Sequence, residues 1–251
     1  MKALFALPFL AATFAVAAEP AAEFTGGIER LDPAFDRLIS PDTKIEVLAT
    51  GFNWSEGPVW KDGGILFSDV PENTVFGWKE GAKAASVALK PSGSLSGDGQ
   101  GSNGLAVDAT GSLILCQHGE RRLARLEKDG KFTSLADNYE GKRFNSPNDL
   151  VIAKNGTIFF TDPPYGMKKG EKPEVDRHGV YALSPDGKVS LVIPDLRWPN
   201  GISLSPDEQT LYIAVSDKDY PRIMAYEVTG IGTAANGRET PLVKNGRVLF
   251  D

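Results

Sequence analysis

The chain has 251 residues and a formal net charge of −6, with 41% hydrophobic and 24% charged residues. This composition is that of a globular protein, and it excludes intrinsic disorder and collagen-like structure. Lys and Arg form no cluster longer than a pair, so we expect no nucleic-acid partner. Two His and one Cys leave too few soft ligands for a closed zinc site. Any bound metal should therefore have oxygen ligands.

Residues 1–18 have the pattern of a secretory signal peptide. Lys2 precedes an apolar run from Ala3 to Val16, and small residues then lead to a cleavage site after Ala17 or Ala18. A membrane anchor is the weaker alternative, because the run is shorter than the roughly 20 residues of a spanning helix. We therefore expect export to the periplasm or the extracellular space, with 19–43 as a lead-in segment and no membrane span in the mature chain.

Residues 44–251 contain a pattern that recurs four times. Each unit has a Glu or Asn, a strand, a Gly or Asp turn, a second apolar strand and a polar corner. The first residues of the units, here called the anchors, are spaced by 47, 45 and 52 residues; they are Glu56, Asn103, Asn148 and Asn200. A unit of this length without helical periodicity is typical of a four-stranded propeller blade. An open β-sandwich is the alternative, although it does not explain the recurring anchors, and 45–50 is predicted to form a further strand that closes the ring.

The anchors are predicted to face one another, because the first strand of each propeller blade lines the central channel. The corners after the second strands return to the same opening, since neighbouring strands are antiparallel; these corners carry Asp69, Gln117, His118, Asp162, Ser216 and Asp217. For a single Asn before Gly, such as Asn103, a turn is the alternative role. The set of four favours a ring of oxygen ligands inside a polar rim.

Two other segments have simpler interpretations. The loop from Pro91 to Gly101 is either a flexible lid over the opening or a plain connector. It runs into a match to the dinucleotide pattern at Gly99–Gly104, which we discard because that pattern requires a strand before it and a helix after it. Cys116 stands in an apolar strand-like run, which indicates a buried small hydrophobe rather than a nucleophile.

Several motifs occur together in a defined order: Ser55-Glu56-Gly57-Pro58-Val59-Trp60, Ser146-Pro147-Asn148-Asp149-Leu150, Phe160-Thr161-Asp162-Pro163-Pro164-Tyr165-Gly166 and Trp198-Pro199-Asn200-Gly201. With them, residues 44–251 resemble the gluconolactonase, senescence-marker-protein and luciferin-regenerating-enzyme-like family. The resemblance implies an all-β, six-bladed β-propeller with one divalent cation, commonly Ca²⁺, on its axis. It also implies hydrolysis of sugar lactones by many members.

Carried over residue by residue, the resemblance makes Glu56, Asn148 and Asn200 metal ligands. The family's fourth ligand and expected catalytic base is an Asp that opens the fifth blade, and no matching segment precedes residue 251. We therefore expect a propeller truncated to about four blades, with open sheet edges, an incomplete site and no assigned catalytic residue.

Four further residues are predicted to contact substrate: Asn103, His118, Asp162 and Tyr165. Asp162 has a turn-capping role as its alternative. His118 would orient a sugar hydroxyl or shuttle a proton, or else be an exposed loop residue without function. Tyr165 would pack against the substrate ring, or only shape its Pro-rich corner.

The predicted function is a metal-dependent hydrolase that opens a sugar lactone. The cation would polarise the carbonyl and assist attack by an activated water. The alternative is a non-catalytic propeller that serves as a binding platform. A small-molecule lactone is the expected partner, and no obligate protein partner is implied.

Overall fold

The computed structural model describes residues 26–230 and 242–251, so the predicted signal peptide lies outside the described residues. The chain divides into two compact units, Met1–Thr50 and Gly51–Asp251. In the described part of the first unit, the 3-10 helix η1 (Pro33–Arg37) begins after Asp32, whose carboxylate accepts a hydrogen bond from the Ala34 amide at 2.7 Å. The strand predicted over 45–50 is wrong. Those residues are in no strand, because no neighbouring strand supplies a ladder for their backbone groups.

The second unit contains four four-stranded antiparallel sheets, each in simple chain order. Blade 1 consists of β1 (Ser55–Lys61), β2 (Gly64–Asp69), β3 (Thr74–Lys79) and β4 (Ser86–Leu89). Blade 2 consists of β5 (Ser102–Val107), β6 (Leu113–Gln117), β7 (Arg122–Leu126) and β8 (Phe132–Ala136). Blade 3 consists of β11 (Leu150–Ile152), β12 (Ile158–Asp162), β13 (Gly179–Leu183) and β14 (Val189–Ile193). Blade 4 consists of β15 (Pro199–Leu204), β16 (Thr210–Val215), β17 (Arg222–Val228) and β18 (Val243–Phe250).

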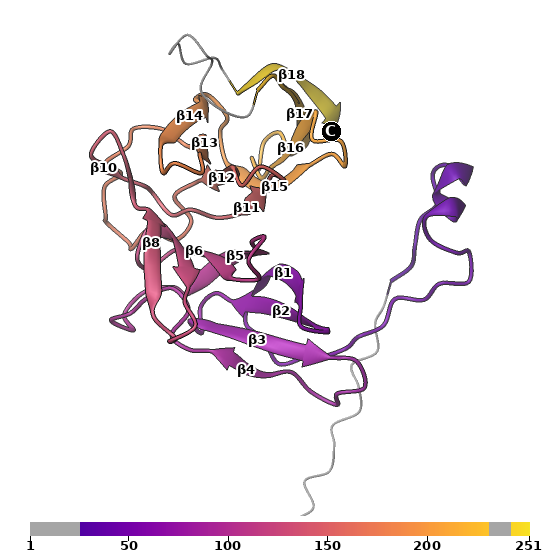
Figure 1. Cartoon of the computed structure of the whole chain (residues 1–251). Coiled ribbons are helices and arrows are strands. Elements are labelled where there is room, and N and C mark those ends of the chain that lie inside the picture. The colour runs from indigo at the N-terminus through magenta and orange to yellow at the C-terminus, as the bar shows by residue number, and fades with distance from the viewer. Residues whose placement is uncertain (1–25, 231–241) are drawn as a thin grey trace, which may run out of the picture. The chain divides into compact units, whose positions relative to one another are not determined.

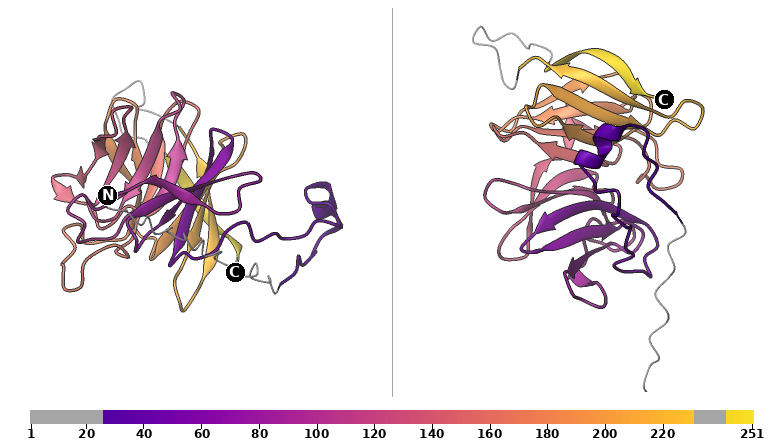
Figure 2. Two further views of the ribbon diagram at one scale, coloured as in Figure 1. Left: turned by 90° about the horizontal axis from the view of Figure 1, so that it is seen from below. Right: turned by 90° about the vertical axis from the view of Figure 1, so that its right-hand side faces the viewer.

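The blades follow one another through space as they do along the chain. A two-stranded hairpin of β9 (Asn138–Tyr139) and β10 (Lys142–Arg143) separates blades 2 and 3. The first strands of consecutive blades contact each other, β1 with β5, β5 with β11 and β11 with β15 (Figure 1). Blade 1 in purple and blade 4 in orange to yellow lie at opposite ends of the series (Figure 2). The prediction of an all-β propeller with four blades in this chain is confirmed.

Alternation along the second strand of each inner blade explains how the blades pack. In β12, Ile158 and Phe160 belong to the core shared with blade 2, whereas Phe159 belongs to the core shared with blade 4. Successive side chains of a strand point to opposite faces of its sheet, so a central blade needs apolar residues at every position. All five residues of β12 are buried. Its first three, Ile158 to Phe160, form a continuous apolar run rather than an alternation.

The single cysteine fits the same packing. Cys116 in β6 is fully buried as a free thiol, and it lies with Ile114 and Leu123 in the core between blades 2 and 3. Burial raises the pKa of this thiol well above its ordinary value. The prediction of a buried small hydrophobe is confirmed. Among residues 26–230 and 242–251, no helix is both long and apolar enough to cross a membrane.

Candidate active site

A cavity of about 420 Å³ brings together the four anchors. Three lie in the first strands of blades 1, 2 and 4, and Asn148 lies just before β11 of blade 3. The cavity is lined by Trp54, Glu56, Val70, Pro71, Gln100, Asn103, His118, Asn148, Tyr165, Asn200 and Ser216. Six of the seven predicted site residues are therefore in one place. Asp162 is the seventh, and it is not among the lining residues. Residues separated by more than a hundred positions share this cavity because equivalent blade positions converge on the channel.

Irregular strand pairing presents the anchors to the cavity. The register between the first and second strands shifts between Glu56 and Val59 in blade 1, and between Ser102 and Leu105 in blade 2. Blade 4 shows the same shift between Pro199 and Ile202. Such bulges bend a strand and re-aim a side chain, and they are common beside functional sites. The turn alternative for Asn103 is wrong, because this residue lies within β5.

Glycines beside the anchors allow neighbouring first strands to approach closely. A Cβ atom on Gly104 would lie 2.6 Å from Asp149 Oδ1 and 2.8 Å from the Asn148 carbonyl oxygen. A Cβ on Gly57 would lie 2.4 Å from the Asn103 carbonyl oxygen. The Gly104 amide instead donates a hydrogen bond to the Asn148 carbonyl at 2.7 Å. The Gly after an anchor therefore serves close strand packing, which brings the anchor side chains together.

The anchor side chains form a set of oxygen donors that fits a hard cation. Trp54 Nε1 donates to Glu56 Oε1 at 2.7 Å, and Asn200 Nδ2 donates to Ser216 Oγ at 3.1 Å. These bonds leave the second Glu56 carboxylate oxygen and the amide oxygen of Asn200 to the cavity. Asn148 is only 2% exposed, and its Oδ1 has no hydrogen-bond partner. A buried acceptor without a donor is costly, and a bound cation would satisfy it.

Asp149 is a carboxylate of this region that the sequence interpretation missed. Its Oδ2 accepts a hydrogen bond from the Ile202 amide of blade 4 at 3.1 Å, and its Oδ1 accepts one from the Leu150 amide at 2.9 Å. Burial raises the pKa of Asp149, these amide bonds oppose the rise, and the negative charge of Glu56 adds to it. A cation between the anchors would offset that repulsion. The motif Asn148-Asp149 was the available signal, because the other three blades have Gly after the anchor.

Asp162 does not line the cavity but holds the backbone segment that precedes Asn148. Its two carboxylate oxygens accept hydrogen bonds from the backbone amides of Asn145 and Ser146, each at 2.8 Å. Asp162 is fully buried, which raises the pKa of its carboxyl to about 7, although both amide bonds and the Arg121 charge oppose the rise. These bonds reach a segment 16 and 17 residues earlier rather than the turn before Pro163. They fix the segment that leads to Asn148.

His118 and Tyr165 enclose the cavity from two corners. His118 is 1% exposed, and its Nδ1 lies 3.0 Å from Oε1 of Gln100, a residue from the loop before β5. The Tyr165 ring stacks on Trp198 at 5.5 Å between ring centroids. Burial raises the pKa of the Tyr165 hydroxyl, and the side chains of Ser216 and Asn200 partly offset the rise. The alternative that His118 is an exposed loop residue is wrong, because its ring lies between Gln100 and Gly166 and is 1% exposed.

The Pro91–Gly101 loop is a hydrogen-bonded connector. Asn73 Oδ1 accepts bonds from three consecutive amides, those of Ser92, Gly93 and Ser94, at 2.8 to 3.1 Å. Asn73 Nδ2 donates to the Ser94 carbonyl at 2.7 Å. This side chain fixes the path of the loop and so carries Gln100 to the cavity, which the sequence alone did not indicate.

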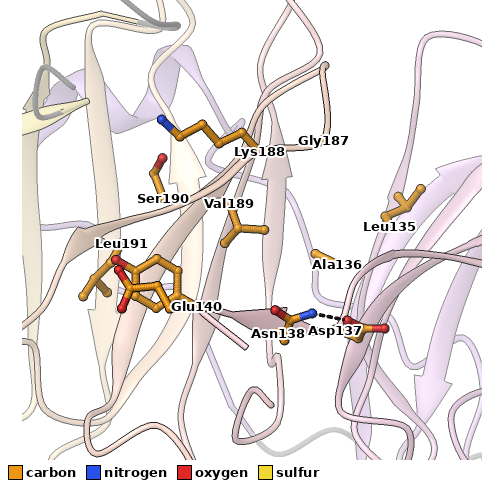
Figure 3. A pocket seen from close by; sticks show the side chains of 11 residues that line it. Leu135, Ala136, Asp137, Asn138, Glu140, Gly187, Lys188, Val189, Ser190 and Leu191 are labelled. Atoms are coloured by element: carbon orange, nitrogen blue, oxygen red, sulfur yellow. Dashed lines mark hydrogen bonds between the residues drawn. The ribbon is translucent and has the colours of Figure 1, made fainter. Parts of the chain in front are cut away.

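A second hollow of about 450 Å³ provides a contrast at the outer strands of blades 2 and 3. There Lys188 and Ser190 lie across from Asp137 and Asn138, and Asn138 Nδ2 donates to Asp137 Oδ1 at 2.7 Å (Figure 3). Within the described part of the chain, none of its lining residues carries a buried polar atom without a partner. The axial cavity has two such residues that are almost fully buried, Asn148 and His118, and this favours it as the functional site.

Comparison with known proteins agrees with this geometry. Residues 54–251 match the model of the SMP-30/Gluconolactonase/LRE-like region. The chain belongs to this family. It is 41% identical to a gluconolactonase of Zymomonas mobilis over 219 residues, which are 82% of this chain and 61% of that protein. The chain therefore spans about three fifths of the length of this curated relative.

Solved structures of the family have the same arrangement. A gluconolactonase of Xanthomonas campestris superposes with a TM-score of 0.68 at 36% identity, covering 80% of this chain and 64% of that one. A luciferin-regenerating enzyme superposes with a TM-score of 0.57 at 20% identity, covering 79% of this chain and 61% of the other. The second likeness shows the fold alone.

Proposed function

We propose that the protein hydrolyses a sugar lactone, by addition of water across the ring ester to give the open hydroxy acid, at the cavity between the four anchors. The observation that carries the proposal is the buried, unpartnered Oδ1 of Asn148 in a cavity shared with Glu56 and Asn200. The likeness to the gluconolactonases of Zymomonas and Xanthomonas supports the reaction class.

The residues that would hold a divalent cation are Glu56, Asn148 and Asn200. One carboxylate and two amide oxygens form a hard donor set that suits Ca²⁺, which takes six to eight oxygens and leaves positions for waters and substrate. No group of three or more His, Cys, Asp or Glu in the described ranges could hold a metal. A site here would therefore depend on amide oxygens. When bound, the cation supplies Lewis acidity toward a lactone carbonyl.

The chain's own residues would bind and orient the substrate. Tyr165 is held by its stacking on Trp198 and offers an apolar face to a sugar ring. Asn103, at 6% exposure, offers amide donors and an acceptor to ring hydroxyls. Trp54 Nε1 holds one oxygen of Glu56 and so orients the carboxylate. We also propose that residues 1–18 direct export of the protein to the periplasm or the extracellular space, and that the propeller domain is residues 44–251.

The test is the Ca²⁺-dependent hydrolysis of glucono-δ-lactone, followed by acid release, together with calorimetric titration of Ca²⁺. We expect Glu56→Gln and Asn148→Ala to weaken Ca²⁺ binding by more than the roughly 10- to 100-fold typical of outer-shell changes, with activity falling in parallel. Glu227→Gln and Asn155→Ala are matched controls. Glu227 lies in an outer strand pair, where its Oε2 accepts a hydrogen bond from Asn245 Nδ2 at 3.0 Å. The Asn155 amide oxygen accepts only the Thr157 amide, within a turn.

The outcomes separate the enzyme from a binding platform. Wild-type protein that binds Ca²⁺ and the lactone but leaves hydrolysis at the spontaneous rate would support the non-catalytic alternative. Unchanged Ca²⁺ binding in both site variants would show that the anchors hold no cation.

A further inference from the structure

The contact between Gln100 and His118 is fixed on both sides by backbone hydrogen bonds. The His118 amide donates to the Gly101 carbonyl, and the Gly119 amide donates to the Gln100 carbonyl, both at 3.1 Å. Two consecutive residues of the β6–β7 corner are thus paired with two consecutive residues of the loop. This pairing places Gln100 Oε1 3.0 Å from His118 Nδ1.

A second loop covers the imidazole ring. A Cβ atom on Gly166 would lie 2.4 Å from His118 Cγ and 2.6 Å from its Nδ1. The Gly166 amide donates to Ser146 Oγ at 2.8 Å, so this corner is itself held in place. The ring is thus packed against the Gly166 backbone on one side and bonded to Gln100 on the other.

The orientation of the Gln100 amide, with Oε1 toward the ring, assigns the proton to one of the two ring nitrogens. An amide oxygen can only accept, so Gln100 Oε1 requires a hydrogen on His118 Nδ1. In the neutral ring Nε2 then has a lone pair and no hydrogen. This Nε2 is buried without a partner, and the ring lines the cavity. An unpaired buried acceptor is costly, and a hydroxyl donor from a ligand would satisfy it.

We infer that His118 Nε2 accepts a hydrogen bond from a hydroxyl group of the substrate, and that Gln100 is the positioning residue that holds the accepting tautomer. This inference rests on the proposed function and adds to it a preference for hydroxylated lactones over unsubstituted ones. Burial lowers the pKa of His118 to about 4, so the ring is neutral at physiological pH and cannot act as a proton donor there. As a base it would create a buried imidazolium, which burial disfavours.

The tautomer can be measured without any activity. The chain has only two histidines, His118 and His178, so long-range proton–nitrogen NMR spectra of histidine-labelled protein contain two rings, and His178→Gln assigns them. We expect protonated Nδ1 and unprotonated Nε2 in His118. In Gln100→Leu we expect the proton to redistribute between the two nitrogens. A proton on Nε2 of the wild-type ring would overturn the inference.

The hydroxyl contact is tested by substrate preference. We compare kcat/KM for glucono-δ-lactone and for δ-valerolactone, which lacks ring hydroxyls. In His118→Leu the ratio of the two should fall about tenfold, as expected for loss of one buried hydrogen bond of roughly 1.4 kcal/mol. His118→Gln retains an acceptor and should recover part of the ratio. A general-base role would instead lower both values equally, and an unchanged ratio would overturn the inference.

Failure of the proposed function gives a different result. If wild-type protein hydrolyses neither lactone, titration with the non-hydrolysable δ-gluconolactam still reports on the contact. A shift of the His118 Nε2 resonance in wild type supports the contact, and binding of the lactam without that shift contradicts it. His178→Gln is the matched control, because His178 packs against Trp198 and does not line the cavity.

Discussion

The corners of blades 1 and 3 differ from those of blades 2 and 4 in what their side chains do. In blade 1, Asp69 accepts hydrogen bonds from the backbone amides of Asn53 and Trp54, at 2.9 and 3.2 Å. Asp162 does the same in blade 3 for the amides of Asn145 and Ser146. In both blades a predicted metal ligand follows two residues after the second amide. In each of these two blades an aspartate thus orients the backbone segment that leads to a predicted metal ligand.

Blades 2 and 4 fix the equivalent segments without a carboxylate, through a backbone hydrogen bond that blade 1 also has, from the Val70 amide to the Trp54 carbonyl at 3.1 Å. The His118 amide donates to the Gly101 carbonyl, and the Ser216 amide donates to the Trp198 carbonyl at 3.0 Å. The side chains of His118 and Ser216 line the cavity. Val70 of blade 1 lines the cavity from the same position, so what distinguishes blades 1 and 3 is the carboxylate that holds the segment leading to Glu56 or Asn148.

The largest effect is expected from Asp162→Ala. The change leaves two buried amides without an acceptor, which we expect to lower the free energy of unfolding by about 3 kcal/mol. Ca²⁺ binding should weaken by roughly 10- to 100-fold, because the segment that leads to Asn148 loses its anchor. Urea unfolding and calorimetry measure the two effects. Asp186→Ala, at an exposed turn of the same blade, is the control, and equal behaviour of the two variants would contradict the clamp.

A smaller effect concerns the dependence of stability on pH. The pKa of Asp162 is raised to about 7 in the folded protein, from an ordinary 3.8. Between these values the folded state holds a proton that the unfolded state has lost, so this contribution to stability is present below about pH 4 and is lost as the pH rises through about 7. The free energy of unfolding should therefore fall more steeply over this window in wild type than in Asp162→Asn. Parallel curves would show that the carboxyl is ionised throughout.

Asp69→Ala should lower the free energy of unfolding by less than Asp162→Ala, the corresponding change in blade 3. Asp69 accepts hydrogen bonds from the backbone amides of Asn53 and Trp54. Both residues are exposed, so water can replace the carboxylate as their acceptor. We expect a loss of about 1 kcal/mol, measured by urea unfolding beside Asp162→Ala. An equal or larger loss would mean that burial does not distinguish the two clamps.

The repeat made much of this site predictable. Equivalent positions in successive blades converge, so Glu56, Asn103, Asn148 and Asn200 could be placed in one cavity from spacing alone. The role of Asp162 could not be settled, because an aspartate at a strand end has the same sequence pattern whether it clamps a backbone or contacts a ligand. The occurrence of Asp69 at the corresponding place in blade 1 was the signal for a shared structural role.

Other parts of the site depend on contacts that no local pattern encodes. Gln100 reaches the cavity because its loop is held by Asn73, a residue of another corner. The Asn73 side chain accepts hydrogen bonds from three backbone amides of that loop. The role of Trp54 could not be predicted from the sequence for a similar reason, since it depends on one side-chain hydrogen bond to Glu56. Residues from irregular loops are set by tertiary hydrogen bonds, whereas residues in repeated strands are set by the repeat.

The smallest effect is expected from Ser216→Ala, which tests a corner held by the backbone. Ser216 Oγ accepts the hydrogen bond from Asn200 Nδ2. This bond holds the nitrogen of the Asn200 amide and leaves its oxygen to the cavity. Loss of this partly exposed bond should change the free energy of unfolding by less than about 0.5 kcal/mol. The amide can then turn its nitrogen toward the cavity, which should weaken Ca²⁺ binding a few-fold. Ser216→Thr keeps the hydroxyl and should retain affinity. A variant that loses stability rather than affinity would place Ser216 with the carboxylate clamps of blades 1 and 3, because a side chain whose hydrogen bond directs Asn200 should affect ion binding more than the fold.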